Sequence, residues 1–117
     1  MKDDRVYLRH ILDAVGKILD FTRGGREAFI ADPMIQDSVI RNIEVIGEAA
    51  KSLSSAVKDA NPDIPWTQIA SMRNTLIHRY FRVDLDLVWQ VVEQDLPGFK
   101  IQLEAILNEL PSPPEGS

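Results

Sequence analysis

Residues 32–53 read DPMIQDSVIRNIEVIGEAAKSL, and this stretch decides the fold. Asp32 is a typical helix N-cap, and Pro33 fits the first turn of a helix because its missing N–H is not needed there. Apolar side chains then recur every three or four residues, which predicts a helix of about twenty residues with one buried face. They are Ile35, Val39, Ile43, Ile46, Ala50 and Leu53. Around Gly47 the side chains are small, so a second helix can approach closely.

The same periodicity continues on both sides of this stretch. Residues 8–19 carry an apolar stripe that stops near the Gly24-Gly25 pair. The pattern resumes at Trp66, breaks over residues 80–83, and returns over 85–93 behind Asp84, a plausible N-cap. A last helix is expected to start at Asp95 and to run through residue 110. Residues 54–65 are expected to form a loop, because Pro62 and Pro65 disfavour regular structure there. These segments predict an all-α, up-and-down bundle of about five helices.

Length and composition set the broad class of the protein. The 117 residues are 44% hydrophobic and 26% charged, an ordinary globular mixture that suits one domain. We assign residues 1–110 to the helical domain and 111–117, which read PSPPEGS, to a flexible tail. The chain has no cysteine, which excludes disulfide scaffolds and thiol catalysis. Charge interrupts every long apolar stretch and the N-terminus has no secretory pattern, so we expect no membrane contact and a cytoplasmic location.

Charge is spread unevenly along the chain. The formal net charge of −5 argues against a general nucleic-acid coat protein, whose affinity would rest on basic residues. Residues 64–83, however, contain no acidic residue and include Arg73, Arg79 and Arg82. This segment predicts a small positive site on an acidic body. The alternative is that these arginines only tie helices together, by pairing with Glu48, Asp84 and Asp86.

The two histidines differ in their sequence context. His10 has no partner residues around it that suggest chemistry, so we interpret it as a surface or packing residue. His78 follows a cation and an amide and precedes a phenol in the run Arg73-Asn74-Thr75-Leu76-Ile77-His78-Arg79-Tyr80. A neutral imidazole can take the proton of an RNA 2′-hydroxyl, and a guanidinium can hold the charge that develops on the phosphate oxygens. The residues of this run therefore suit the cleavage of RNA. That reaction needs no metal ion, and we expect no metal or other cofactor, because no pair of histidines or carboxylates here has the spacing of metal ligands.

Helix geometry restricts how this run can work. Asn74 and His78 are four residues apart and share a helix face, whereas Arg73 and His78 are five apart, which separates them by about 140°. Either the helix unwinds at His78, or two copies of the chain face each other across a two-fold axis. We prefer the homodimer, in which one composite cleft holds Arg73 and His78 of both copies. Trp66 and Trp89 are expected to be core or interface anchors.

The run Arg-Asn-x-Leu-x-His-x-Tyr at 73–80, followed by Phe81-x-Val83-Asp84, resembles the signature of HEPN-domain proteins, and more closely that of the HepT-like toxin branch. The Ile43-Glu44-x-Ile46-Gly47-Glu48-Ala49 run, the Ile64-Pro65-Trp66 lead-in and Asp95-Leu96-Pro97 also fit that branch. The similarity covers roughly residues 4–110, and it is specific because the short core motif is embedded in these flanks.

The resemblance implies the toxin of a HepT/MntA toxin–antitoxin pair (type II or type VII). It implies a dimeric, metal-independent endoribonuclease that leaves a 2′,3′-cyclic phosphate on its substrate, a tRNA or mRNA. It implies that Arg73 and His78 are catalytic and that Asn74, the polar residue after the arginine, supports them. From the residues themselves we expect Glu48 to pack near the cleft and support Arg73. Arg79, at a variable family position, and Arg82 are expected only to contact RNA.

The resemblance also implies a partner for the toxin. A nucleotidyltransferase antitoxin of the MNT type would block the toxin by transferring AMP to Tyr80, where bulk and negative charge would meet the RNA phosphate. The alternative function is a non-catalytic HEPN module that binds the nucleotidyltransferase.

Overall fold

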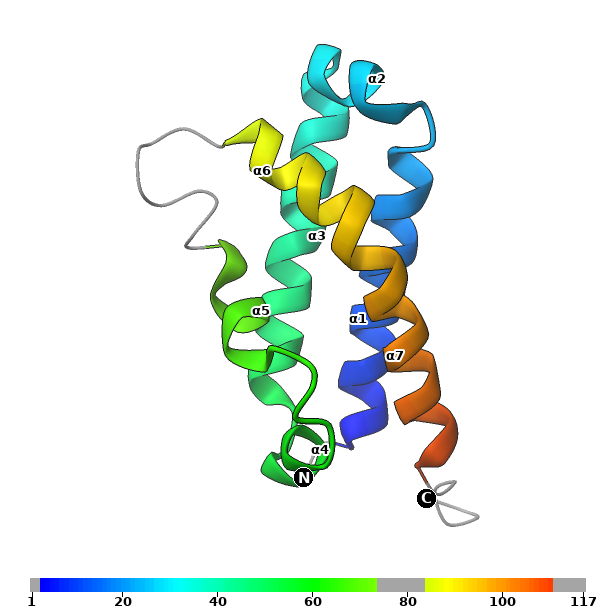
Figure 1. Cartoon of the computed structure of the whole chain (residues 1–117), viewed down its shortest axis with the longest axis vertical. Helices are drawn as coiled ribbons and strands as arrows, with labels where there is room; N and C mark the ends of the chain where they lie inside the picture. The colour runs from blue at the N-terminus through cyan, green and yellow to red at the C-terminus, as the bar shows by residue number, and fades with distance from the viewer. Residues whose placement is uncertain (1–2, 74–83, 111–117) are drawn as a thin grey trace.

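The computed structural model describes residues 3–73 and 84–110, and every regular element in these two ranges is helical (Figure 1). In chain order the elements are α1 (Asp4–Phe21), α2 (Gly25–Ala31), α3 (Pro33–Ser52), α4 (Ser55–Ala60), α5 (Trp66–Arg73), α6 (Leu85–Gln90), a π-helical turn η2 (Val91–Asp95) and α7 (Leu96–Glu109). The prediction of an all-α fold is confirmed for this part of the chain.

The long helices α1 and α3 run antiparallel and form the centre of the bundle (Figure 1). Helix α5 lies along one side of α3, and the α6–η2–α7 stretch crosses the front of the bundle and packs on α1. The start of α1 and the end of α7 lie at the same end of the molecule. The chain thus follows the expected up-and-down course.

Carboxylates cap the starts of three helices. The side chain of Asp32 accepts the backbone N–H of Met34 at 2.9 Å, and that of Asp84 accepts the N–H of Leu87 at 3.1 Å. Both were predicted, because an acid before an apolar periodic segment can satisfy one of the unpaired N–H groups of the first turn. Asp3 caps α1 in the same way, through the N–H of Arg5 at 2.9 Å.

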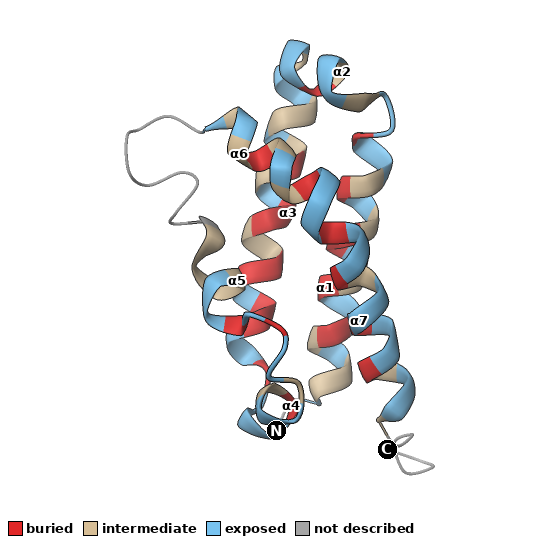
Figure 2. Cartoon of the chain, in the orientation of Figure 1, coloured by how far each residue is buried: buried red, intermediate tan, exposed pale blue. Residues whose placement is uncertain are grey.

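The core lies on the inward faces of the helices, as the buried stripes in Figure 2 show. The side chains of Leu8, Ile43, Ile46 and Leu103 are almost completely shielded from solvent, and full burial of one such side chain contributes roughly 1.5–3 kcal/mol.

The prediction that the tryptophans are structural anchors is also confirmed. Trp66 is buried, with its ring 6.4 Å from that of Phe99. The half-buried Trp89 packs on Phe29 at 5.6 Å.

The prediction of a loop over residues 54–65 is wrong in part. Residues Ser55–Ala60 form α4, which begins behind Ser54, whose hydroxyl accepts the N–H of Val57 at 3.3 Å. Val57 is buried, so the short helix has one apolar contact with the core. The helix ends before Pro62, so the prolines prevent regular structure only in the residues that follow the helix.

The prediction of two separate helices after Asp84 is also wrong. Helix α6, the π turn and α7 follow one another without a break, and Asp95 has helical backbone angles and makes no side-chain capping bond. The N–H of Leu96 bonds to the carbonyl of Val91, five residues earlier. Pro97 has no N–H and its ring would clash with a regular helix, so a turn with one extra residue accommodates the proline inside a continuous helix.

Candidate functional site

The predicted catalytic run begins at the end of α5. Arg73 is the last residue of this helix, and the structure gives the position of its backbone. Asn74, His78, Arg79, Tyr80 and Arg82 lie outside the described residues, and so does the tail 111–117. The described site therefore consists of the elements that lead into this run and the surfaces beside it.

A close contact between two helices fixes the position of α5. A Cβ atom built on Gly47 of α3 would lie 3.1 Å from the carbonyl oxygen of Ala70 and 3.6 Å from that of Ile69. Any side chain at position 47 would press on the α5 backbone, so glycine permits this approach. The expectation that the small residues around Gly47 admit another helix is confirmed.

The same contact sets the register of α3 and α5. The two helices run in opposite directions side by side (Figure 1). Because Gly47 faces Ala70, three residues forward on α5 correspond to three residues back on α3, about 4.5 Å along the axis. The backbone of Arg73 is therefore level with Glu44. Glu48, the carboxylate predicted to support Arg73, lies about one turn further along α3.

The start of α5 is anchored to the loop that precedes it. The indole N–H of Trp66 donates to the carbonyl oxygen of Asn61 at 3.1 Å, and Ile64 in the same loop is buried in the core. Further along α5, the partly buried Ile69 and Met72 pack against the core, and they line a groove with Val91 and Phe99 whose volume is about 600 Å³. Both ends of the helix that carries Arg73 are thus tied to the core.

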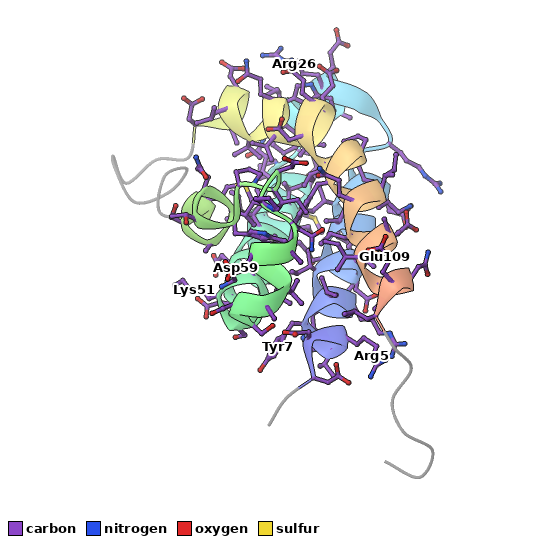
Figure 3. The ribbon with its side chains drawn as sticks, turned by 60° about the horizontal axis from the view of Figure 1, so that its bottom comes forward. Arg5, Tyr7, Arg26, Lys51, Asp59 and Glu109 are labelled. Carbon is purple, nitrogen blue, oxygen red and sulfur yellow. The ribbon has the colours of Figure 1, made fainter. Side chains whose placement is uncertain are left out.

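A second groove, of about 410 Å³, lies between α1 and α3 on the outer face of α3. Its lining consists of Tyr7, His10, Arg41, Glu44, Val45, Glu48, Ala49 and Ser52. The carboxylate of Asp4 accepts bonds from the N–H and the hydroxyl of Ser54 at 2.8 and 2.7 Å, which joins the start of α1 to the end of α3. In this antiparallel register Tyr7 is roughly level with Ser52 along the helix axes and His10 with Glu48, and all four residues line the groove. Figure 3 shows Tyr7 and Arg5 on opposite sides of α1.

Each carboxylate that lines this α1–α3 groove is paired with a cation, although one of these cations, Lys51, is not itself part of the lining. A guanidinium nitrogen of Arg41 lies 3.8 Å from a carboxylate oxygen of Glu44, and the ammonium of Lys51 lies 3.8 Å from that of Glu48. The side chain of Glu48 is 77% exposed. At this separation and exposure each pair is weak, so the carboxylate of Glu48 stays accessible to a ligand.

Sequence reasoning missed this groove. His10 was interpreted as a surface or packing residue, and it is indeed exposed and in edge-to-face contact with Tyr7. The available signal was the spacing of Arg41, Glu44 and Glu48, which places three charged residues on one face of a helix. Which residues of α1 lie opposite this face depends on how α1 is rotated against α3, and the spacing of residues within α3 does not predict that rotation.

The acids proposed as structural partners of the arginines have other contacts. Asp86 pairs with Arg26 of α2, Glu48 pairs with Lys51, and Asp84 caps α6. Across residues 3–73 and 84–110, no three His, Cys, Asp or Glu side chains come together in a way that could hold a metal ion. No helix in the same ranges has the length and apolar character required to cross a membrane.

Curated proteins similar to this chain carry ribonuclease names. A protein of Methanocaldococcus jannaschii named "Gamma-glutamylcyclotransferase and putative RNase" is 43% identical, over 93% of this chain and 50% of its own length. A "Probable ribonuclease HepT" of Thermococcus cleftensis is 42% identical, over 86% of this chain and 92% of its own length. A "Putative RNase" of M. jannaschii is 34% identical, over 90% and 97%.

This chain therefore spans about half of the first of these relatives and nearly all of the other two. No solved structure shows significant similarity to it. The family model described as "Ribonuclease HepT-like" matches residues 11–106. Because this match covers most of the chain, the protein belongs to the HepT-like ribonuclease family, a family of HEPN proteins.

Proposed function

We propose that this protein is an endoribonuclease and the toxin of a toxin–antitoxin pair. The observation that carries the proposal is the match of residues 11–106 to a ribonuclease family, because the Arg73–His78 run lies within this span. The first residue of the run, Arg73, is the last residue of α5, which packs closely on α3 through Gly47 and Ala70. The names of the relatives, which include an RNase and a ribonuclease HepT, support the same activity.

The proposed reaction is an attack by an RNA 2′-oxygen on the neighbouring phosphorus. Neutral His78 takes the proton of the 2′-hydroxyl, the new P–O2′ bond forms, and the P–O5′ bond breaks. Arg73 holds the charge on the non-bridging oxygens in the transition state. The products are a 2′,3′-cyclic phosphate and a 5′-hydroxyl, whose oxygen takes up a proton. No metal ion is needed for any of these steps.

A homodimer completes the site in this proposal. Two copies contribute Arg73 and His78 to one cleft, so that the second His78, in its protonated form, can supply the proton to the leaving oxygen. Asn74 and Glu48 support the catalytic pair, and Arg79 and Arg82 contact the RNA. The antitoxin is a nucleotidyltransferase of the MNT type, which transfers AMP to Tyr80 and so places negative charge where the phosphate must bind.

The experiment that tests this reaction removes the nucleophile. An RNA oligonucleotide that the protein cuts at one position is compared with the same oligonucleotide carrying 2′-deoxyribose at that position. We expect the deoxy substrate to remain whole and the RNA fragments to end in a 2′,3′-cyclic phosphate. Cleavage of the deoxy substrate at the same position, or a free 3′-hydroxyl on the RNA product, would contradict the mechanism. A protein that cuts no RNA would favour the non-catalytic module.

A further inference from the structure

The α1–α3 groove is a second surface of the bundle, and of its lining residues only Glu48 has a part in the proposed reaction. Its volume of about 410 Å³ is within the range of roughly 300–1,000 Å³ typical of small-ligand sites. Both helices belong to the rigid centre of the bundle, so the lining side chains are held on a fixed framework.

The charge of the groove argues against a phosphate as its main ligand. The two carboxylates, Glu44 and Glu48, are each within 3.8 Å of a cation, Arg41 and Lys51 respectively. Of these four groups only Arg41, Glu44 and Glu48 line the groove, one cation and two carboxylates, so the groove has no surplus of positive charge to hold an anion. A polar ligand group without formal charge therefore fits the groove better than an anion does.

The aromatic residues of the groove suit a planar ligand. The rings of Tyr7 and His10 are 6.4 Å apart and nearly perpendicular, at 88°. Because the rings are perpendicular, a flat ring that stacks on one of them meets the edge of the other. Single-stranded RNA is commonly recognised in this manner, by stacking of unpaired bases on aromatic side chains.

The accessible carboxylate specifies which base would fit. Glu48 is level with His10 and 77% exposed, and an ionised carboxylate only accepts hydrogen bonds. Guanine carries two neighbouring N–H donors, N1–H and the N2 amino group, on its Watson–Crick edge. A carboxylate can accept both at once, whereas adenine, cytosine and uracil do not offer this pair of donors.

The groove reaches the level of α3 at which α5 ends. Glu44 lines one part of the groove and is level with the backbone of Arg73 on α5. A base held near Glu48 is thus about one helical turn along α3 from the level at which the catalytic run begins.

From this combination we infer that the α1–α3 groove binds a guanine base of the RNA substrate. Glu48 reads its Watson–Crick edge, while one of the two rings, Tyr7 or His10, stacks on its face and the other meets its edge. The inference rests on the proposed function for the identity of the substrate. In this inference Glu48 supports the reaction by recognising a base of the RNA.

A binding measurement tests the groove without any cleavage. In the His78→Ala variant His10 is the only histidine, so its imidazole C–H signal in an NMR spectrum reports directly on the groove. The variant is titrated with 5′-GMP, 5′-AMP, 5′-CMP and 5′-UMP, which differ only in the base. We expect a saturable shift of the His10 signal with GMP, and binding of the other three nucleotides weaker by roughly tenfold. Equal responses to all four nucleotides, or no response to GMP, would overturn the inference.

A second variant separates recognition from a general charge effect. Glu48→Gln should weaken GMP binding by roughly tenfold, because an amide cannot accept two hydrogen bonds side by side. Glu104→Gln, the same change on the exposed face of α7, should bind GMP as the parent variant does. Equal affinities of the two variants for GMP would overturn the role of Glu48. GMP binding by a protein whose wild-type form cuts no RNA would support the groove and overturn the proposed function.

Discussion

Gly47 of α3 and Ala70 of α5 lie so close that a Cβ atom on Gly47 would be 3.1 Å from the carbonyl oxygen of Ala70. The atom it would meet belongs to a helix backbone and cannot rotate away as a side chain can. Because Arg73 is three residues beyond Ala70, this contact fixes the level of α3 at which α5 ends.

The first prediction concerns this contact. Gly16 lies in the interior of α1 with nothing within 4 Å of its Cβ position, so Gly16→Ala should stabilise the protein by roughly 0.5–1 kcal/mol. Gly47→Ala has the same helix propensity gain but must displace α5, so its free energy of unfolding should be lower than that of Gly16→Ala by at least about 1 kcal/mol. Urea unfolding of both variants measures the difference, and equal stabilisation by the two substitutions would show that α3 and α5 are not held this closely.

The second prediction concerns pH. The backbone N–H of Arg5 donates to the Asp3 carboxylate and is the main cause of its lowered pKa in the folded protein. The guanidinium of Arg5 donates to the same carboxylate and lowers the pKa further. Ionised Asp3 therefore stabilises the fold at neutral pH, and this contribution is lost as the pH falls below about 4, through the folded-state pKa. The Asp3→Asn variant keeps a capping oxygen but no charge, so wild type should be more stable at neutral pH and the difference should vanish in acid. Unfolding measured from neutral pH to about pH 3 checks this, and a pH-independent difference would contradict it.

The third prediction concerns the composite site. Arg73→Ala and His78→Ala should each cut RNA far more slowly than wild type, but an equal mixture allowed to exchange subunits should regain part of the activity. Recovery is only partial because a mixed dimer lacks the second His78, which serves as the acid. About half of the dimers in such a mixture contain one copy of each variant, which brings an intact Arg73 and an intact His78 into one cleft. RNA cleavage by the mixture measures the recovery. A mixture no faster than its components would indicate that each copy needs its own intact pair.

The fourth prediction concerns regulation. After co-expression with an active MNT-type nucleotidyltransferase, the peptide spanning residues 63–83 should gain the mass of AMP. A protease that cuts before aspartate releases this peptide, in which Tyr80 is the only tyrosine. The peptide that carries Tyr7 is the internal control, and Tyr80→Phe should remain unmodified. Unmodified Tyr80 in the presence of an active transferase would exclude this form of control.

Sequence periodicity predicted the helical fold because each long helix buries one continuous stripe. The caps at Asp32 and Asp84 could be predicted because each carboxylate bonds to an N–H group in the first turn of the helix that directly follows it. This interaction does not depend on how the helices pack. The helix over Ser55–Ala60 was missed because it is short and depends on the single buried Val57. The continuity through Pro97 was missed because it requires a π turn, and proline more often marks a helix start.

The candidate site was predictable only in part. The Arg73–His78 run is contiguous in sequence and carries its own chemical pattern. The α1–α3 groove combines Tyr7 and His10 with residues more than thirty positions away, and its shape depends on how two helices are rotated against each other. Glu48 was singled out from sequence, but its position beside His10 follows from the register that Asp4 and Ser54 set.

The most direct test of the account is cleavage of single-stranded RNA in excess chelator by wild type and two variants, Arg73→Ala and His78→Ala. Arg23→Ala is the matched control, because this arginine is 81% exposed in the turn after α1, beside Asp20. We predict that wild type and Arg23→Ala cut the RNA at the same rate, and that the other two variants are slower by roughly 10²–10⁴-fold. RNA left whole by wild type, or cut equally fast by Arg73→Ala and His78→Ala, would contradict the proposed function.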